Sequence, residues 1–103
     1  MEPIATKEIA PRNSEAKAQG LIEIRNQFMG NSRADQAMRL REALRRFSVS
    51  TLEARRYLDI MHPAGRVQEL REGGNDIDTL RITERSDVGR PHCVAVYVLR
   101  KEA

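Results

Sequence analysis

Residues 50–74 read STLEARRYLDIMHPAGRVQELREGG and contain the signals for two short helices joined by a tight turn. Ser50 and Glu53 form a predicted capping box at the start of the first helix. Pro63 suits the first turn of the second helix, where its missing N–H costs nothing, and Gly73-Gly74 ends that helix. This order of signals predicts a helix-turn-helix.

The turn between the two helices is predicted at residues 59–61, with the Ile60 side chain in the core. A further helix is predicted before residue 50, where Ser32 is the N-cap and Asp35 stands at the capping-box position. The apolar face of that helix is formed by Ala37, Leu40, Leu44 and Phe47. The arginines that lie off the centre of this face are Arg39, Arg41, Arg45 and Arg46.

Two strands are predicted after the helices, one within residues 76–83 and one at residues 94–99. Residues 84–92, between them, contain the Gly and Pro expected of a hairpin loop. Residues 31–103 are therefore predicted to form an α+β domain, a winged helix-turn-helix with a three-helix core and a C-terminal β-hairpin wing.

Residues 1–30 are predicted to be a flexible N-terminal extension that is part helical. Residues 1–13 contain two prolines and scattered small residues, which predict a disordered leader. Ser14 is a candidate cap for a helix that runs to about Met29. The narrow apolar stripe of that helix is made by Leu21, Ile24 and Phe28. Three alternatives remain open for this stripe: it packs on the domain, pairs with a second copy in a homodimer, or stays unfolded.

The length of 103 residues allows one small domain. No apolar run approaches the roughly 18 to 20 residues that cross a bilayer, and the N-terminus lacks the basic stretch and apolar core of a secretory signal. The single cysteine, Cys93, cannot form an internal disulfide, and its place in an apolar run predicts a buried, inert thiol. These features favour a cytoplasmic protein without a membrane partner.

The net charge of +3 falls on the predicted helical core. Residues 31–72 hold nine arginines against six carboxylates, whereas residues 1–30 and residues 73–103 are each balanced. Arginine favours forked contacts to phosphates and bases. The alternative for a charge excess this small is a solvated face with ion pairs within the helices.

The helix that starts at Pro63 is the candidate reader of a DNA major groove. Helical periodicity turns its apolar residues inward and leaves polar residues on the remaining surface. The candidate contacts on that surface are His62, Gly65, Arg66, Gln68 and Glu69. Two alternatives remain open: His62 simply caps the helix, and Arg66 simply pairs with Glu69.

Two further pairs of residues are candidates for contacts to the DNA backbone. Arg85 and Arg90 are the basic tips of the hairpin loop, and arginine is favoured by the negative potential of a minor groove. Ser50 and Thr51 offer backbone N–H groups at a helix start, which suit a phosphate. The alternative for the loop is an ordinary solvated hairpin.

Three segments together resemble a small family of helix-turn-helix domains found in phages, prophages and integrated elements. These segments are Thr51-Leu52-Glu53-Ala54, Leu58-Asp59-Ile60 and Ala64-Gly65-Arg66-Val67-Gln68-Glu69-Leu70-Arg71. The resemblance covers about residues 36–99 and implies a winged helix that binds DNA, without implying a target sequence. This chain departs from the family pattern at Asp59, where the turn often has glycine, and at Pro63, at the start of the helix.

The sequence thus predicts a DNA-binding regulator or accessory factor of a phage or mobile element, with double-stranded DNA as its partner. The alternative is a winged-helix protein-interaction module without DNA binding, which the outward carboxylates Glu69 and Glu72 favour. An enzyme is not expected, because neither His62 nor His92 has a second His or Cys at metal-ligand spacing and no phosphate-binding loop or nucleophile motif occurs. Accordingly, no catalytic residue, metal or cofactor is predicted.

Overall fold

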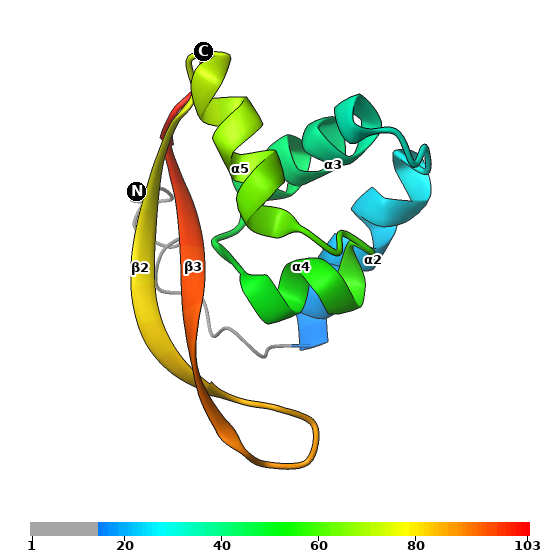
Figure 1. The fold of residues 1–103 in the computed structure, drawn as a ribbon. Helices are drawn as coiled ribbons and strands as arrows, with labels where there is room; N and C mark the ends of the chain where they lie inside the picture. Colours follow the sequence, from blue (N-terminus) through cyan, green and yellow to red (C-terminus); the bar gives the residue numbers. More distant parts are fainter. Residues whose placement is uncertain (1–14) are drawn as a thin grey trace, which may run out of the picture.

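The computed structural model describes residues 15–103, which form helices packed against one face of an antiparallel sheet (Figure 1). In chain order the elements are α2 (Glu15–Gln27), α3 (Arg33–Arg46), β1 (Val49–Ser50), α4 (Thr51–Tyr57), α5 (Pro63–Glu72), β2 (Asp76–Arg85) and β3 (Pro91–Lys101). The strands lie in the order β1-β3-β2, and both neighbouring pairs are antiparallel. The predicted α+β arrangement is therefore confirmed. None of the helices in this part of the chain is long and apolar enough to span a membrane.

Capping side chains begin α3 and α4 where the sequence predicted them. The Asp35 N–H donates to Ser32 Oγ over 3.0 Å at the start of α3. At α4 the Glu53 N–H donates to Ser50 Oγ over 3.0 Å, and the Ser50 N–H donates to Glu53 Oε1 over 2.9 Å. These bonds satisfy amides that have no acceptor within the helix itself. Both predicted helix starts are therefore confirmed.

The turn between α4 and α5 contains a left-handed residue. Asp59 has φ 56°, a conformation that favours glycine and that Asp tolerates because its short side chain can bond locally. The Ile60 N–H donates to Ala54 O over 3.1 Å, and the Ile60 side chain is fully buried. The prediction that Ile60 fills the core is confirmed, and Pro63 opens α5 as expected.

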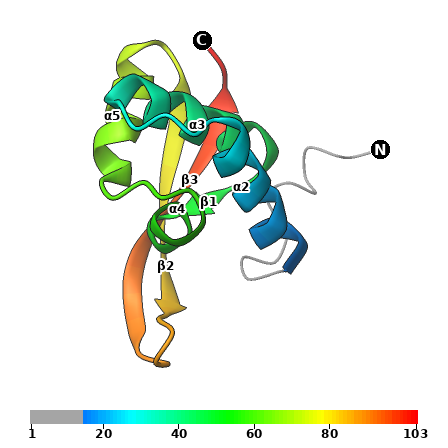
Figure 2. The same ribbon diagram turned by 90° about the vertical axis from the view of Figure 1, so that its right-hand side faces the viewer.

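The helix α2 lies against α3 and α4 (Figure 2). Leu21 and Ile24 are fully buried in the same core as the other helices, and Phe28 packs on its margin. Of the three alternatives for this stripe, the structure shows packing on the domain, so Leu21 and Ile24 are not available to a second copy. The predicted cap Ser14 and the predicted leader at residues 1–13 lie outside the described residues.

The hairpin strands β2 and β3 are longer than predicted. Much of the loop predicted at residues 84–92 is strand, because Glu84 pairs with His92 and Arg85 pairs with Pro91. These residues are mostly polar, so no apolar alternation marked them as strand. As a result the hairpin projects beyond the helices (Figure 1).

The prediction that Cys93 is buried is wrong. Its thiol is exposed, because this end of β3 extends past the helices that cover Ala95, Tyr97 and Leu99 (Figure 1). The apolar run is continuous in the sequence, but the helical cover ends before it reaches Cys93.

The buried side of α3 contains a charged residue, Arg39, which is only 2% exposed. Its guanidinium donates to the carbonyl oxygens of Phe28 (2.6 Å), Gly30 (2.8 Å), Leu58 (2.8 Å) and Asp59 (3.4 Å). Burial lowers the pKa of Arg39, while the nearby carboxylate of Asp59 acts to raise it. Through these bonds Arg39 ties the end of α2 to the turn that precedes α5.

Candidate nucleic-acid interface

The helix α5 turns one side to the core and the other to solvent. Val67 is 1% exposed, whereas Gln68 and Glu72 are exposed. Gly65 borders open space, since a Cβ built there would meet no atom within 4 Å. At Gly65 the backbone of α5 can therefore approach a partner surface closely.

Arg66 and Glu69 bind each other along α5. Arg66 Nε donates to Glu69 Oε1 over 2.9 Å, and Arg66 Nη2 donates to Glu69 Oε2 over 3.0 Å. Arg66 is only 8% exposed, so its guanidinium is largely withdrawn from solvent. Of the two roles considered for Arg66, contact with DNA and pairing with Glu69, the structure shows the pairing with Glu69. Next to this pair, Gln68 Nε2 donates weakly to Glu72 Oε2 over 3.4 Å.

His62 occupies the N-cap position of α5 and is exposed. Its side chain makes no capping hydrogen bond, so the alternative in which His62 caps the helix is wrong. Pro63 follows directly and has no N–H to be capped. The imidazole is left accessible at the amino-terminal edge of α5.

Ser50 and Thr51 join α4 to the sheet. Ser50 is fully buried, and its N–H already donates to Glu53 Oε1. The Thr51 hydroxyl donates to Ala95 O over 3.4 Å, which links α4 to β3. The prediction that the Ser50 N–H is available to a phosphate is therefore wrong, because that amide already takes part in the capping box. Thr51 remains partly accessible.

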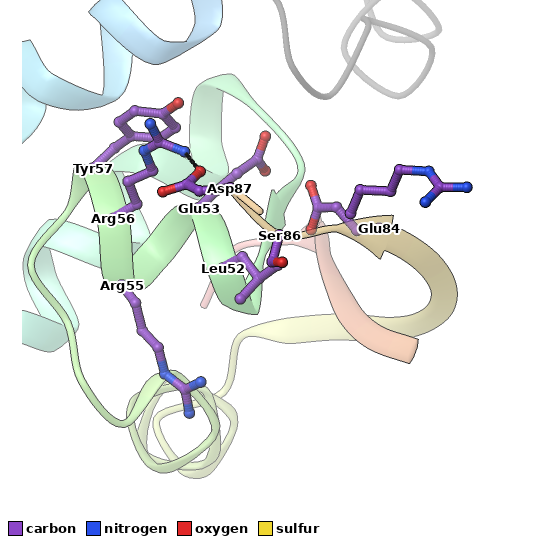
Figure 3. A pocket seen from close by; sticks show the side chains of 9 residues that line it. Leu52, Glu53, Arg55, Arg56, Tyr57, Glu84, Ser86 and Asp87 are labelled. Atoms are coloured by element: carbon purple, nitrogen blue, oxygen red, sulfur yellow. Dashed lines mark hydrogen bonds and ion pairs between the residues drawn. The ribbon is translucent and has the colours of Figure 1, made fainter. Parts of the chain in front are cut away.

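The turn of the wing carries Arg85 and Arg90 at the end of the hairpin. Arg85 Nη1 donates to Gly89 O over 2.7 Å, which braces the turn, and Arg90 is exposed. Asp87, the carboxylate of this turn, forms an ion pair with Arg56 of α4 (Figure 3). This pair holds the wing against α4 and neutralises the carboxylate of the turn.

A groove of about 390 Å³ lies between α4 and the hairpin. Its polar lining is made by Thr51, Arg55, Arg81, Ser86 and His92, and no carboxylate lines it. Arg55 is held in place by a hydrogen bond from Nε to Met61 O over 3.1 Å. Within residues 15–103, none of Arg55, Arg81 and Arg90 takes part in an ion pair. This groove, which we call the cationic groove, has the charge and the donors that a chain of phosphates requires.

Of the polar residues that line the cationic groove, only Thr51 was predicted as a DNA contact, and the four that were not predicted are Arg55, Arg81, Ser86 and His92. Arg81 and His92 lie in strand segments whose partners are set by the hairpin register, which pairs Arg81 with Ala95. Ala95 is also the residue whose carbonyl binds Thr51. The proximity of Arg81 to α4 follows from this register, and no local motif in the sequence indicates it.

A second cavity, of about 320 Å³, lies between α4 and the wing (Figure 3). Glu53 and Glu84 line it and are 4% and 6% exposed, and Lys17 Nζ lies 3.1 Å from Glu53 Oε1. Burial raises the pKa of Glu53, and the charge of Lys17 opposes that rise. Arg55, Arg56 and Arg85 also line this cavity, and Arg55 is shared with the cationic groove, so the buried carboxylates Glu53 and Glu84 lie directly beside the cationic surface. Among residues 15–103, no group of three or more His, Cys, Asp or Glu side chains is placed to hold a metal ion.

Comparison with known proteins gives one match. A family model described as a winged helix-turn-helix domain matches residues 35–102, which run from the first turn of α3 to the end of the wing hairpin. Searches among curated proteins and among solved structures each gave no significant match. A winged helix-turn-helix domain suggests a capacity to bind DNA, and such domains are typically not enzymes. Because the match spans well over half of the chain and every element of the cationic groove, the chain belongs to the winged helix-turn-helix domain family.

Proposed function

We propose that this protein binds double-stranded DNA in the cytoplasm, as a regulator or accessory factor of a phage or other mobile element. The observation that carries DNA binding is the cationic groove, where Arg55, Arg81 and His92 gather without a carboxylate. Guanidinium groups bind phosphate oxygens through two parallel hydrogen bonds, which makes arginine well suited to a DNA backbone. The mobile-element setting is supported by the resemblance of residues 51–71 to domains from phages and integrated elements.

The wing and α4 supply most of the affinity in this proposal. Arg85 and Arg90 are exposed near the turn of the wing and would add contacts beyond the cationic groove, which neither of them lines. The ion pair between Arg56 and Asp87 removes the charge that would otherwise repel phosphates there. Contacts of this kind position a protein on the duplex without reading its sequence.

The amino-terminal half of α5 is proposed to read the bases. His62, Gly65 and Gln68 are the accessible candidates on that half. The Gln68 amide can bond an adenine edge with both its donor and its acceptor, and its 3.4 Å contact to Glu72 is weak enough to be exchanged. We assign Arg66 and Glu69 to support of the helix, because each already satisfies the other.

Fluorescence anisotropy with a short labelled duplex of random sequence tests the proposal. Arg81→Gln combined with Arg90→Gln should weaken binding by about 10- to 100-fold at low salt and reduce the slope of log K against log salt by about 2. The control, Arg33→Gln combined with Lys101→Gln, removes the same charge from exposed positions outside the cationic groove. The control should lose less than about threefold. Equal losses in the two variants would show that net charge governs binding, and the assignment to the cationic groove and the wing would fail.

A protein-interaction module is the second candidate function. The accessible side of α5 presents Gln68 and Glu72, and its last arginine, Arg71, is engaged with Ile77 O at 2.7 Å and Thr79 Oγ1 at 2.8 Å. This side therefore suits a basic protein partner better than a phosphate chain. If wild-type protein at micromolar concentration and low salt produced no anisotropy change with duplex, this second candidate would replace the first.

A further inference from the structure

The cavity between α4 and the wing is lined by two carboxylates that come from different elements. Glu53 belongs to α4 and Glu84 belongs to β2, and both are turned toward the space between α4 and the hairpin (Figure 3). They are close enough that the charge of Glu84 acts to raise the pKa of Glu53. Both are buried, so each negative charge costs free energy unless a cation or a hydrogen-bond donor meets it.

Each of these carboxylates has an oxygen that lacks a donor. Glu53 Oε1 accepts a hydrogen bond from the Ser50 N–H and lies 3.1 Å from Lys17 Nζ. Within residues 15–103, neither Glu53 Oε2 nor Glu84 Oε1 has a hydrogen-bond partner. In the same part of the chain, Lys17 is the one cation that forms an ion pair with either carboxylate. One ammonium group therefore faces two carboxylates.

Three arginines also line the cavity, but each of them is bound to another acceptor. These acceptors are Met61 O for Arg55, the Asp87 carboxylate for Arg56 and Gly89 O for Arg85. The Arg55 side chain points away from Glu53 and Glu84 (Figure 3). The arginines of the lining therefore do not neutralise these two carboxylates.

The rest of the lining includes apolar surface from Leu52 and the ring of Tyr57. The volume of about 320 Å³ lies at the lower end of the range for small-molecule sites, about 300–1,000 Å³. Such sites commonly combine apolar walls with a few converging polar groups. Within residues 15–103 no third ligand joins the two carboxylates to hold a metal ion, so the lining suits an organic cation better.

We propose that this cavity binds a small primary alkylamine, whose ammonium group donates to Glu53 Oε2 and Glu84 Oε1 while its alkyl chain lies along Leu52. An ammonium group has three donors and no acceptor, so it can reach both carboxylates at once. The ammonium group of Lys17 shows the same chemistry at the other oxygen of Glu53. A bound amine would join α4 to β2 and brace the wing. This binding needs no DNA and is independent of the proposed function.

Titration of the ¹⁵N-labelled full chain with butylamine at neutral pH tests the site, with 1-butanol as the uncharged probe of the same alkyl length. We expect saturable shifts of the amide signals of α4 and of Glu84, with a dissociation constant of about 1 mM for so small a ligand. 1-Butanol should give no saturable shift. If butylamine gave none up to about 50 mM, the proposal would be overturned, and a proton on one carboxyl group would take the place of the cation.

Glu84→Gln removes one of the two charges at nearly constant side-chain volume. It should weaken butylamine binding by at least about 10-fold. The control, Glu23→Gln, removes the same charge from an exposed position of α2 and should change the dissociation constant by less than about twofold. Equal weakening in the two variants would contradict a site at Glu84, because it would reflect only the general attraction of a cation to the protein.

A lysine side chain of a partner protein carries the same ammonium group as a small amine. Lysine that is capped at both its α-amino and its α-carboxyl group serves as the probe for that source. Tighter binding of butylamine than of capped lysine would support a free amine as the ligand. Tighter binding of capped lysine would overturn that choice and assign the cavity to a side chain of another protein.

Discussion

Arg39 shows how one side chain can hold several segments of a small domain. Its guanidinium donates to Phe28 O and Gly30 O beyond α2, and to Leu58 O at the end of α4. Helix ends leave such carbonyls without intrahelical donors, and the planar fork of arginine can reach several of them at once. Helical periodicity put Arg39 off the centre of the apolar face and did not reveal that it is buried, because the carbonyls that it binds come from segments that only the folded chain brings together.

Arg39→Met should therefore cost far more than an ordinary surface substitution. We expect the free energy of unfolding to fall by about 3 kcal/mol, because buried carbonyls lose their donors while the apolar contacts of the side chain are largely kept. Urea denaturation followed by circular dichroism measures the change. Arg33→Met alters an exposed arginine of the same helix and should cost less than about 0.5 kcal/mol. Similar losses in both variants would contradict a structural role for the buried guanidinium.

At the scale of elements, the helix caps could be predicted from the local sequence, whereas the extent of strand pairing could not. The caps at Ser32 and Ser50 act within three residues of the chain, so their residue types suffice to place them. The length of β2 depends on pairing of polar residues such as Glu84, and the sequence could not reveal it. The same contrast holds in the candidate interface: the pairing of Arg66 with Glu69 was foreseen as an alternative, whereas Arg81 enters the cationic groove through the hairpin register.

Glu53 connects three elements and should make their stability depend on pH. Burial raises its pKa above the ordinary value, against the opposing charge of Lys17, and nearby Glu84 adds to the rise. The folded state thus binds this proton more tightly than the unfolded state. The contribution of Glu53 to the free energy of unfolding is therefore largest below its ordinary pKa and decreases as pH rises to the raised pKa.

Urea titrations over a series of pH values measure this dependence. The difference in unfolding free energy between wild type and Glu53→Gln should decrease between the ordinary and the raised pKa and be level above it. Glu23→Gln, at an exposed position of α2, should give a difference without that slope. If the difference in unfolding free energy between wild type and Glu53→Gln did not change with pH, the Glu53 carboxyl group would have the same pKa in the folded and unfolded states.

For the whole molecule, the parts outside the helix-turn-helix are anchored to its core. Glu102, which directly follows β3, accepts hydrogen bonds from Arg45 Nε over 2.9 Å and Arg41 Nη2 over 3.1 Å, so the end of β3 is held on α3. The hydrogen bond from Arg45 holds the pKa of Glu102 below its usual value. At the other end, α2 lies before the matched residues 35–102 yet contributes to the same core. A single cooperative unit is the consequence expected of such shared packing.

Ile24→Ala tests that cooperativity. Ile24 is fully buried in the cluster that also contains Leu40 and Leu44, so its truncation should cost about 3 kcal/mol and lower Tm by about 10–20 °C. Because the cluster is shared, we expect circular dichroism and the hydrogen exchange of β3 amides to report one transition at the same lowered midpoint. Glu23→Ala, at the exposed neighbour, should leave Tm within about 3 °C of wild type. If the helical signal were instead lost at a lower temperature while the protection of the β3 amides stayed unchanged, α2 would be an extension that unfolds separately. The narrow apolar stripe of α2 left that alternative open.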